Sequence, residues 1–151
     1  HIPITHNRKA ASIIKFFQKD GRKSMQKWLN RMEKYKKIIL PILEQEGVPP
    51  EIFYLAMIES GLNPKAYSYA HASGIWQFIK STGKIYGLKQ NWWVDERRDL
   101  TKATHAASAY LKDLHKEFEK NLIFHLKLII FVVLPNLFLL PFLLLDALLV
   151  I

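Results

Sequence analysis

The chain has 151 residues, which is enough for one domain with a core of its own, or for one domain with an appendage. It contains no cysteine, so disulfides, thiolate metal sites and cysteine nucleophiles are excluded. Lys and Arg outnumber Asp and Glu by 22 to 13. The net charge of +9 favours nucleic acid, anionic lipid or a cell-wall polymer as a partner, although ordinary surface charge explains it equally well.

The sequence contains no motif typical of nucleic-acid binding or of metal binding. No RNP-type motif, zinc-finger spacing or helix-turn-helix pattern occurs, so we expect no nucleic-acid binding. The six histidines show no H-x-x-x-H spacing on a helix face, so we expect no metal site and no other cofactor. The chain begins with His1 rather than Met, which indicates a fragment or a processed product.

Residues 1–48 are basic and periodic, and they predict three helices. The first should end near Gly21, and the second should present an apolar face that includes Trp28. The third should carry Pro41 near its first turn and end near Gly47. Together these helices would form a lead-in to the region that follows.

Residues 49–120 hold most of the Gly and Trp residues. A helix should start at Pro50 and end after Ser60, with Gly61 as its left-handed cap. No convincing strand pattern appears, so the predicted fold class is all-α. The remaining expected elements are a loop over 62–73, short helices over 74–80 and 81–86, an irregular stretch over 89–100, and a helix capped by Thr101 or Thr104.

Residues 121–151 are almost purely apolar. Within them, residues 128–151 number 24, of which 20 are apolar, and a membrane-spanning helix needs about 20 such residues. Two prolines, an Asn and an Asp weaken a span. Two interpretations therefore remain open: membrane association through 128–151, or a chain end produced by a shifted reading frame.

Glu59 stands out because it occupies the apolar stripe of its own helix, at i+7 from Ile52, where a leucine would be expected. Desolvation there should raise its pKa, and the negative end of the helix dipole acts in the same direction. A carboxylic acid that stays protonated near neutral pH is the proton donor that cleavage of a glycosidic bond requires. The alternative is a Glu that pairs with Arg or Lys, or that turns out into water.

The residues around Glu59 form an ordered set of motifs that together resemble the goose-lysozyme-like lytic transglycosylases, the SLT domain. Within that family they are most like the membrane-bound transglycosylase D type. The resemblance covers about residues 10–118 and implies an all-α, lysozyme-like fold. The motifs are Glu59-Ser60-Gly61, Asn63-Pro64-x-Ala66, Gly74-Ile75-Trp76-Gln77-Phe78, Thr82-Gly83-x-x-Tyr86-Gly87-Leu88 and Asp95-Glu96-Arg97-Arg98-Asp99.

The resemblance also implies an activity: cleavage of the β-1,4 bond between N-acetylmuramic acid and N-acetylglucosamine in peptidoglycan glycan strands, with a 1,6-anhydro product. By match of motif, Glu59 takes the role of acid and then of base. Ser60 takes the polar position beside it, and Gln77 is the glutamine that hydrogen-bonds the glycan. The implied location is the bacterial cell envelope, in the periplasm or at the outer membrane.

The other motif residues have more than one interpretation. Trp76 and Phe78 are expected in the core, since they flank Gln77 on other faces. Trp92 and Trp93 could stack on sugar rings, but we interpret them as packing anchors. The run from Asp95 to Asp99 should form an ion-pair network that fixes its loop, rather than supply a second catalytic carboxylate.

The resemblance stops after about Lys120, and the A-Y-N-x-G motif that the family would show next is absent from residues 119–151. The domain would then consist of a lead-in (1–48), an incomplete SLT catalytic core (49–120) and an apolar tail (121–151). Without that segment we expect water to reach Glu59 and its pKa to fall back. A hydrolytic muramidase, an inactive glycan-binding remnant and a membrane-tethered structural protein remain as alternatives.

Overall fold

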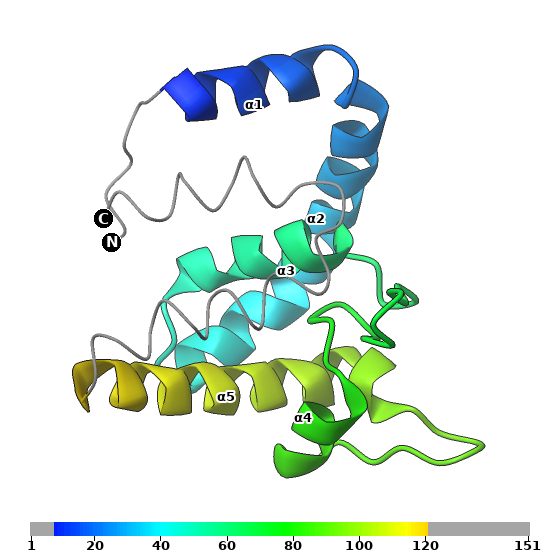
Figure 1. Cartoon of the computed structure of the whole chain (residues 1–151), viewed down its shortest axis with the longest axis vertical. Helices are drawn as coiled ribbons and strands as arrows, with labels where there is room; N and C mark the ends of the chain where they lie inside the picture. The colour runs from blue at the N-terminus through cyan, green and yellow to red at the C-terminus, as the bar shows by residue number, and fades with distance from the viewer. Residues whose placement is uncertain (1–7, 121–151) are drawn as a thin grey trace.

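The computed structural model describes residues 8–120, and within them the chain is helical (Figure 1). No strand occurs in that range, where only isolated antiparallel bridges form, so the all-α prediction is confirmed. The elements are α1 (Arg8–Gln18), α2 (Arg22–Gln45), η1 (Pro50–Ile52), α3 (Phe53–Ser60), α4 (Lys80–Ile85), η2 (Glu96–Arg98) and α5 (Leu100–Lys120), η1 and η2 being short 3-10 turns.

The predictions made for residues 121–151, a membrane anchor or an aberrant chain end, lie outside the described residues. Among the helices that are described, none combines the length and the apolar character that a membrane span requires.

The helix α2 runs through the boundary that the sequence predicted between a second and a third helix. Pro41 lies in its last turns instead of its first, so that prediction was wrong. A proline inside a helix costs about 3 kcal/mol in an isolated helix, because its nitrogen has no hydrogen to donate. Ile39, Ile42 and Leu43 are buried on either side of Pro41, and this packing offsets the cost. The helix ends at Gln45, before Gly47 with φ 68°, as predicted.

The core lies where α2 packs against both α3 and α5. Small residues on α5 let the helices approach closely, since Ala103, Ala106 and Ala107 are all buried. Figure 1 shows α1 at one end of the molecule and α4 at the other, with α3 between α1 and α5. The buried core residues outside α5 include Ile39, Leu43, Val48, Phe53, Ala56, Leu62, Ile75, Trp76, Phe78 and Leu88.

The predicted short helix over 74–80 does not form. Ser73 and Phe78 are joined by an antiparallel bridge, and residues 74–77 make the tight turn between them. Gly74 has φ 85°, and a Cβ there would lie 1.8 Å from the carbonyl oxygen of Arg97. The turn therefore depends on a contact with a segment more than twenty residues away, which local periodicity cannot reveal. The next helix begins at Lys80, close to the prediction.

The first turn of α5 is capped by Asp99 and not by either of the predicted threonines. The Asp99 carboxylate accepts a hydrogen bond from the backbone N–H of Lys102 at 2.9 Å, which satisfies one of the free donors at a helix start. Thr104 is fully buried inside the helix. Its hydroxyl accepts a hydrogen bond from Nε1 of Trp76 at 3.0 Å, so it ties the turn over 74–77 to α5.

Candidate functional site

The C-terminal end of α3 is fixed by two side chains of α2. Gly61 caps α3 in the left-handed conformation, with φ 59°, and its N–H donates to the carbonyl of Met57 at 2.8 Å. Nη1 of Arg31 donates to the carbonyl of Gly61 at 2.9 Å. The indole of Trp28 lies against Gly61 so closely that a Cβ would come within 2.2 Å of Nε1. This clamp holds the backbone two residues after Glu59.

Glu59 is partly buried near the end of α3. Burial raises its pKa from 4.5 to about 7. None of the ion pairs between described residues involves it, so the alternative of a Glu held by Arg or Lys has no support there. The expectation that water would restore an ordinary pKa was wrong. Near neutral pH this carboxyl is therefore poised between its protonated and ionised forms.

Ser60 links α3 to the turn over 74–77. Its hydroxyl lies 2.8 Å from the carbonyl oxygen of Ile75 and 3.1 Å from that of Ala56, and it donates its one proton to these two oxygens. It also accepts a hydrogen bond from the backbone N–H of Asn63 at 3.2 Å. The hydroxyl is thus used within the fold, and it brings the turn that carries Gln77 to the end of α3.

Gln77 is 7% exposed and adopts an unusual backbone conformation, with φ 50°. Its Nε2 donates to the carbonyl of Gly74 at 2.7 Å across the turn. No described residue donates a hydrogen bond to its Oε1. A buried amide oxygen without a partner costs about 1–3 kcal/mol, and strained backbone of this kind is concentrated at functional sites. Among the described residues, Oε1 of Gln77 is thus a buried acceptor to which no donor is bonded.

The predicted ion-pair network after residue 94 is confirmed, and it reaches further than the sequence indicated. The guanidinium of Arg97 binds both carboxylate oxygens of Asp95, at 2.9 and 2.8 Å. Its Nη1 also donates to the carbonyls of His71 and Phe78, at 2.9 and 3.0 Å. Arg97, which is 3% exposed, thus supports both sides of the turn over 74–77. These bonds could not be predicted from the motifs, because their acceptors are backbone atoms.

The carboxylates of this network are not suited to donate a proton. The hydrogen bond from Arg97 holds the pKa of Asp95 below its usual range. The bond from Lys102 does the same for Glu96, whose other oxygen accepts from the N–H of Lys89 at 2.7 Å. Burial acts in the opposite direction on Glu59, and it is the cause of that residue's raised pKa. Among these carboxyls, only Glu59 has a raised pKa, which is the direction that acid catalysis would require.

The aromatic residues of the motifs divide into two groups. Trp76 and Phe78 are 8% and 5% exposed, so their predicted place in the core is confirmed. Trp92 and Trp93 are 90% and 87% exposed, so the interpretation as packing anchors was wrong. A bridge between Gln90 and Asp95 places them at the tip of a loop, where the described residues offer nothing to pack against.

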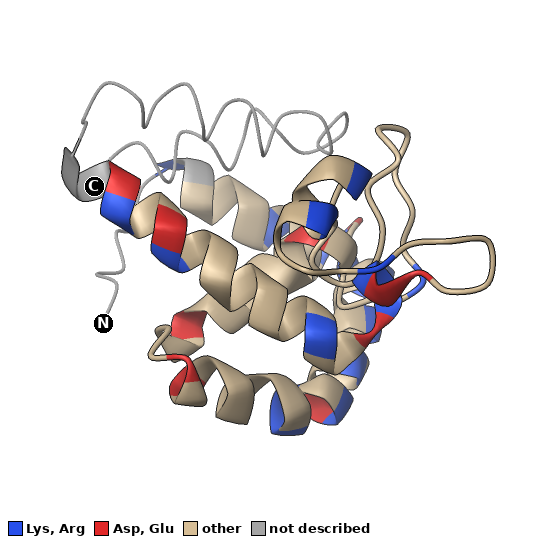
Figure 2. Cartoon of the chain, turned by 90° about the horizontal axis from the view of Figure 1, so that it is seen from below, with Lys and Arg blue, Asp and Glu red and all other residues tan. Residues whose placement is uncertain are grey.

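Two cavities in the described part of the chain are not lined by Glu59. A cavity of about 550 Å³ is lined by Glu46, Glu96, Lys102 and His105 among others, and a second of about 220 Å³ lies beside Tyr54. Figure 2 shows basic and acidic residues interspersed along the helices, as expected of solvated faces. No group of His, Asp and Glu with metal-binding geometry occurs between residues 8 and 120.

The sequence of this chain is similar to a known protein family and to several known proteins. The family model described as "Transglycosylase SLT domain" matches residues 36–127. Over 89 residues, or 59% of this chain, the chain is 42% identical to "Membrane-bound lytic murein transglycosylase D" of Escherichia coli strain K12 and covers 20% of that protein. Over 89 residues it is also 36% identical to "Putative tributyltin chloride resistance protein" of Alteromonas sp. strain M-1, covering 43% of it. The chain thus spans less than half the length of these curated relatives.

Proposed function

Because this chain belongs to the transglycosylase SLT domain family, we propose that it is a lytic transglycosylase that cleaves peptidoglycan glycan strands. The observation that carries the proposal is the Glu59 carboxyl, whose pKa burial raises to about 7. A single group that changes protonation state near neutral pH can act as an acid and then as a base in one reaction. The proposed location is the bacterial cell envelope, as the names of the Escherichia coli relatives suggest.

In the proposed mechanism, protonated Glu59 donates its proton to the oxygen of the bond between N-acetylmuramic acid and N-acetylglucosamine. The bond from that oxygen to the muramyl C1 breaks, and the N-acetylglucosamine-bearing chain leaves with a hydroxyl group. Glu59, now ionised, removes the proton from the muramyl 6-hydroxyl, and the 6-oxygen bonds to C1. The 1,6-anhydro ring closes without consuming water, and Glu59 is protonated again.

We assign Ser60 and Gln77 different roles in this site. The Oε1 of Gln77, to which no described residue donates, would accept a hydrogen bond from a sugar hydroxyl or from the N–H of an N-acetyl group. Ser60 would act as a positioning residue, because its hydroxyl is already bonded to the carbonyl of Ile75 and to the N–H of Asn63. Its bonds keep the turn that carries Gln77 against the end of α3.

The test is a digest of purified peptidoglycan with the full chain and with its Glu59→Gln form, followed by mass spectrometry. We expect the wild-type chain to release anhydro-muropeptides and the variant to release none. Products heavier by one water would indicate hydrolysis, so the chain would be a muramidase. If both forms bound sacculi and neither released fragments, the chain would be a glycan-binding remnant. Either result would refute the proposal.

A further inference from the structure

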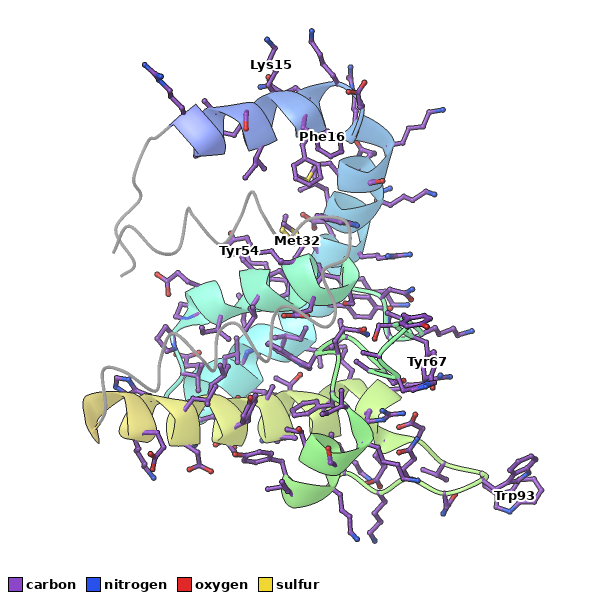
Figure 3. All side chains as sticks on the ribbon, viewed as in Figure 1. Lys15, Phe16, Met32, Tyr54, Tyr67 and Trp93 are labelled. Atoms are coloured by element: carbon purple, nitrogen blue, oxygen red, sulfur yellow. The ribbon has the colours of Figure 1, made fainter. Side chains whose placement is uncertain are left out.

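The loop between α4 and η2 ends in a tip of three consecutive apolar residues, Trp92, Trp93 and Val94. Their exposed fractions are 90%, 87% and 47%. Figure 3 shows Trp93 at the end of this loop, projecting away from the body of the molecule. Apolar side chains gathered on an exposed tip mark a surface that meets a partner.

The tip is held in one shape by its own hydrogen bonds. Oδ1 of Asn91 accepts hydrogen bonds from the backbone N–H groups of Trp93 and Val94, at 2.9 and 2.8 Å. The N–H of Asn91 donates to the carbonyl of Val94 at 2.8 Å, and a bridge between Gln90 and Asp95 closes the loop below. Because the tip is ordered beforehand, little entropy is lost when it binds.

The side chains of residues 92–94 are apolar, apart from the indole N–H groups of the two tryptophans. No residue from 91 to 94 is charged, and Figure 2 shows coloured residues at the base of this loop and none at its end. The side-chain oxygen of Asn91 is used within the turn. A sugar ring needs placed polar groups beside the aromatic face, whereas a lipid interface needs an apolar body with an N–H at headgroup level. The tip fits the lipid interface better.

The charge around the base of the loop is positive. Lys80 and Lys84 are exposed on α4, which precedes the loop. The acidic residues at the base are neutralised, since Asp95 binds Arg97 and Glu96 binds Lys102. Basic groups next to an apolar tip complement the headgroups of anionic lipids.

We propose that residues 92–94 insert into the interfacial region of a membrane that contains anionic lipid, while Lys80 and Lys84 contact its headgroups. This contact does not involve residues 128–151 and does not depend on the proposed glycan-cleaving activity. It would hold the catalytic domain close to a lipid surface.

The absence of cysteine from the chain makes a site-specific test simple. Val94→Cys carries an environment-sensitive fluorophore at the tip, and Tyr69→Cys carries the same fluorophore at a fully exposed position in another loop. With vesicles of phosphatidylcholine and phosphatidylglycerol, we expect a blue shift of the label at position 94 and none at position 69. Replacing both Trp92 and Trp93 by Ala should weaken vesicle partitioning by roughly tenfold, and pure phosphatidylcholine should also weaken it. Circular dichroism checks that the variants fold.

Three outcomes would overturn the proposal. Equal shifts at both positions would indicate general adsorption, through residues 128–151 for example. A label at position 94 that responds to isolated glycan strands and not to vesicles would make the tip a sugar platform. A label that is already blue-shifted in buffer, and insensitive to vesicles, would show that another part of the chain covers the tip.

Discussion

The carboxyl of Glu59 links proton binding to folding. Its pKa is about 7 in the folded protein and 4.5 in the reference state, so between these values the folded state binds more protons than the unfolded state. Stability must therefore fall as the pH rises through this window, and above it the cost is about 3 kcal/mol. Glu59 is in this sense a destabilising residue, and the proposed acid–base role would account for its presence.

Glu59→Gln should stabilise the chain at high pH, because it removes the charge that burial penalises. We expect the melting temperature at pH 8 to rise by about 5–10 °C, with little change at pH 4, where the wild-type carboxyl is already protonated. Thermal unfolding followed by circular dichroism at both pH values measures this. An equal gain at pH 4 and pH 8 would contradict desolvation as the source of the raised pKa.

Gln77 allows a test of ligand binding that spares the fold. Asn tolerates its left-handed backbone, with φ 50°, better than Gln does, but its side chain is shorter by one methylene. Gln77→Asn should therefore leave the melting temperature within a few degrees of wild type, while kcat/KM on glycan strands falls by roughly tenfold. A large loss of stability together with unchanged activity would assign Gln77 a structural role only.

Among single residues, the unusual position of Glu59 could be predicted from the sequence, whereas the conformation of the turn near it could not. Glu59 could be singled out because it breaks the apolar stripe of a helix, and the structure places it where burial raises its pKa. The left-handed backbone of Gln77 could not be predicted from the sequence. It arises in a turn that is closed by the bridge between Ser73 and Phe78. The assignment of catalytic and binding roles remains a prediction.

At the scale of elements, the end of α3 depends on a close contact with α2. A Cβ at Gly61 would lie 2.2 Å from Nε1 of Trp28, in addition to the strain of φ 59°. Gly61→Ala should therefore lower the free energy of unfolding by about 2–4 kcal/mol. Gly47→Ala is the matched control, since Gly47 has φ 68° but no atom within 4 Å of a Cβ. It should cost about 1 kcal/mol, the strain alone.

Urea unfolding of both variants measures the difference. In the Trp28→Ala background, which is itself less stable, Gly61→Ala should cost less than in the wild type, whereas Gly47→Ala should cost the same. Equal losses in the two glycine variants would mean that the Trp28 contact adjusts without cost. The clamp that positions the backbone after Glu59 would then be looser than the structure indicates.

The elements that could be predicted are those whose signal is local. The periodicity before Gly21 and the left-handed cap at Gly61 depend on neighbours within a turn or two, and both were predicted correctly. The continuity of α2 through Pro41 depends on packing against α3 and α5, and it was missed. The same holds for the turn over 74–77, which is shaped by the carbonyl of Arg97.

At the scale of the whole molecule, Arg97 joins segments that are far apart in the sequence. Its guanidinium bonds to Asp95 and to the carbonyls of His71 and Phe78, so it connects the base of the tip loop with both sides of the turn that carries Gln77. A lysine keeps the charge but has no planar fork with which to bind these groups together. The shape of the turn that carries Gln77 should therefore depend on Arg97, even though Arg97 need not touch the substrate.

Arg97→Lys should lower the free energy of unfolding by about 2–4 kcal/mol, because buried acceptors lose their donors. Arg98→Lys is the control: the Arg98 side chain is 46% exposed, and the loss should stay below about 1 kcal/mol. Urea unfolding measures both. Glycan cleavage under conditions where each variant is folded should fall more for Arg97→Lys than for Arg98→Lys, because Arg97 holds the carbonyls of residues 71 and 78 whereas Arg98 gives up one bond to the Ser73 hydroxyl. Full activity in folded Arg97→Lys would show that the turn carrying Gln77 keeps its shape without this support.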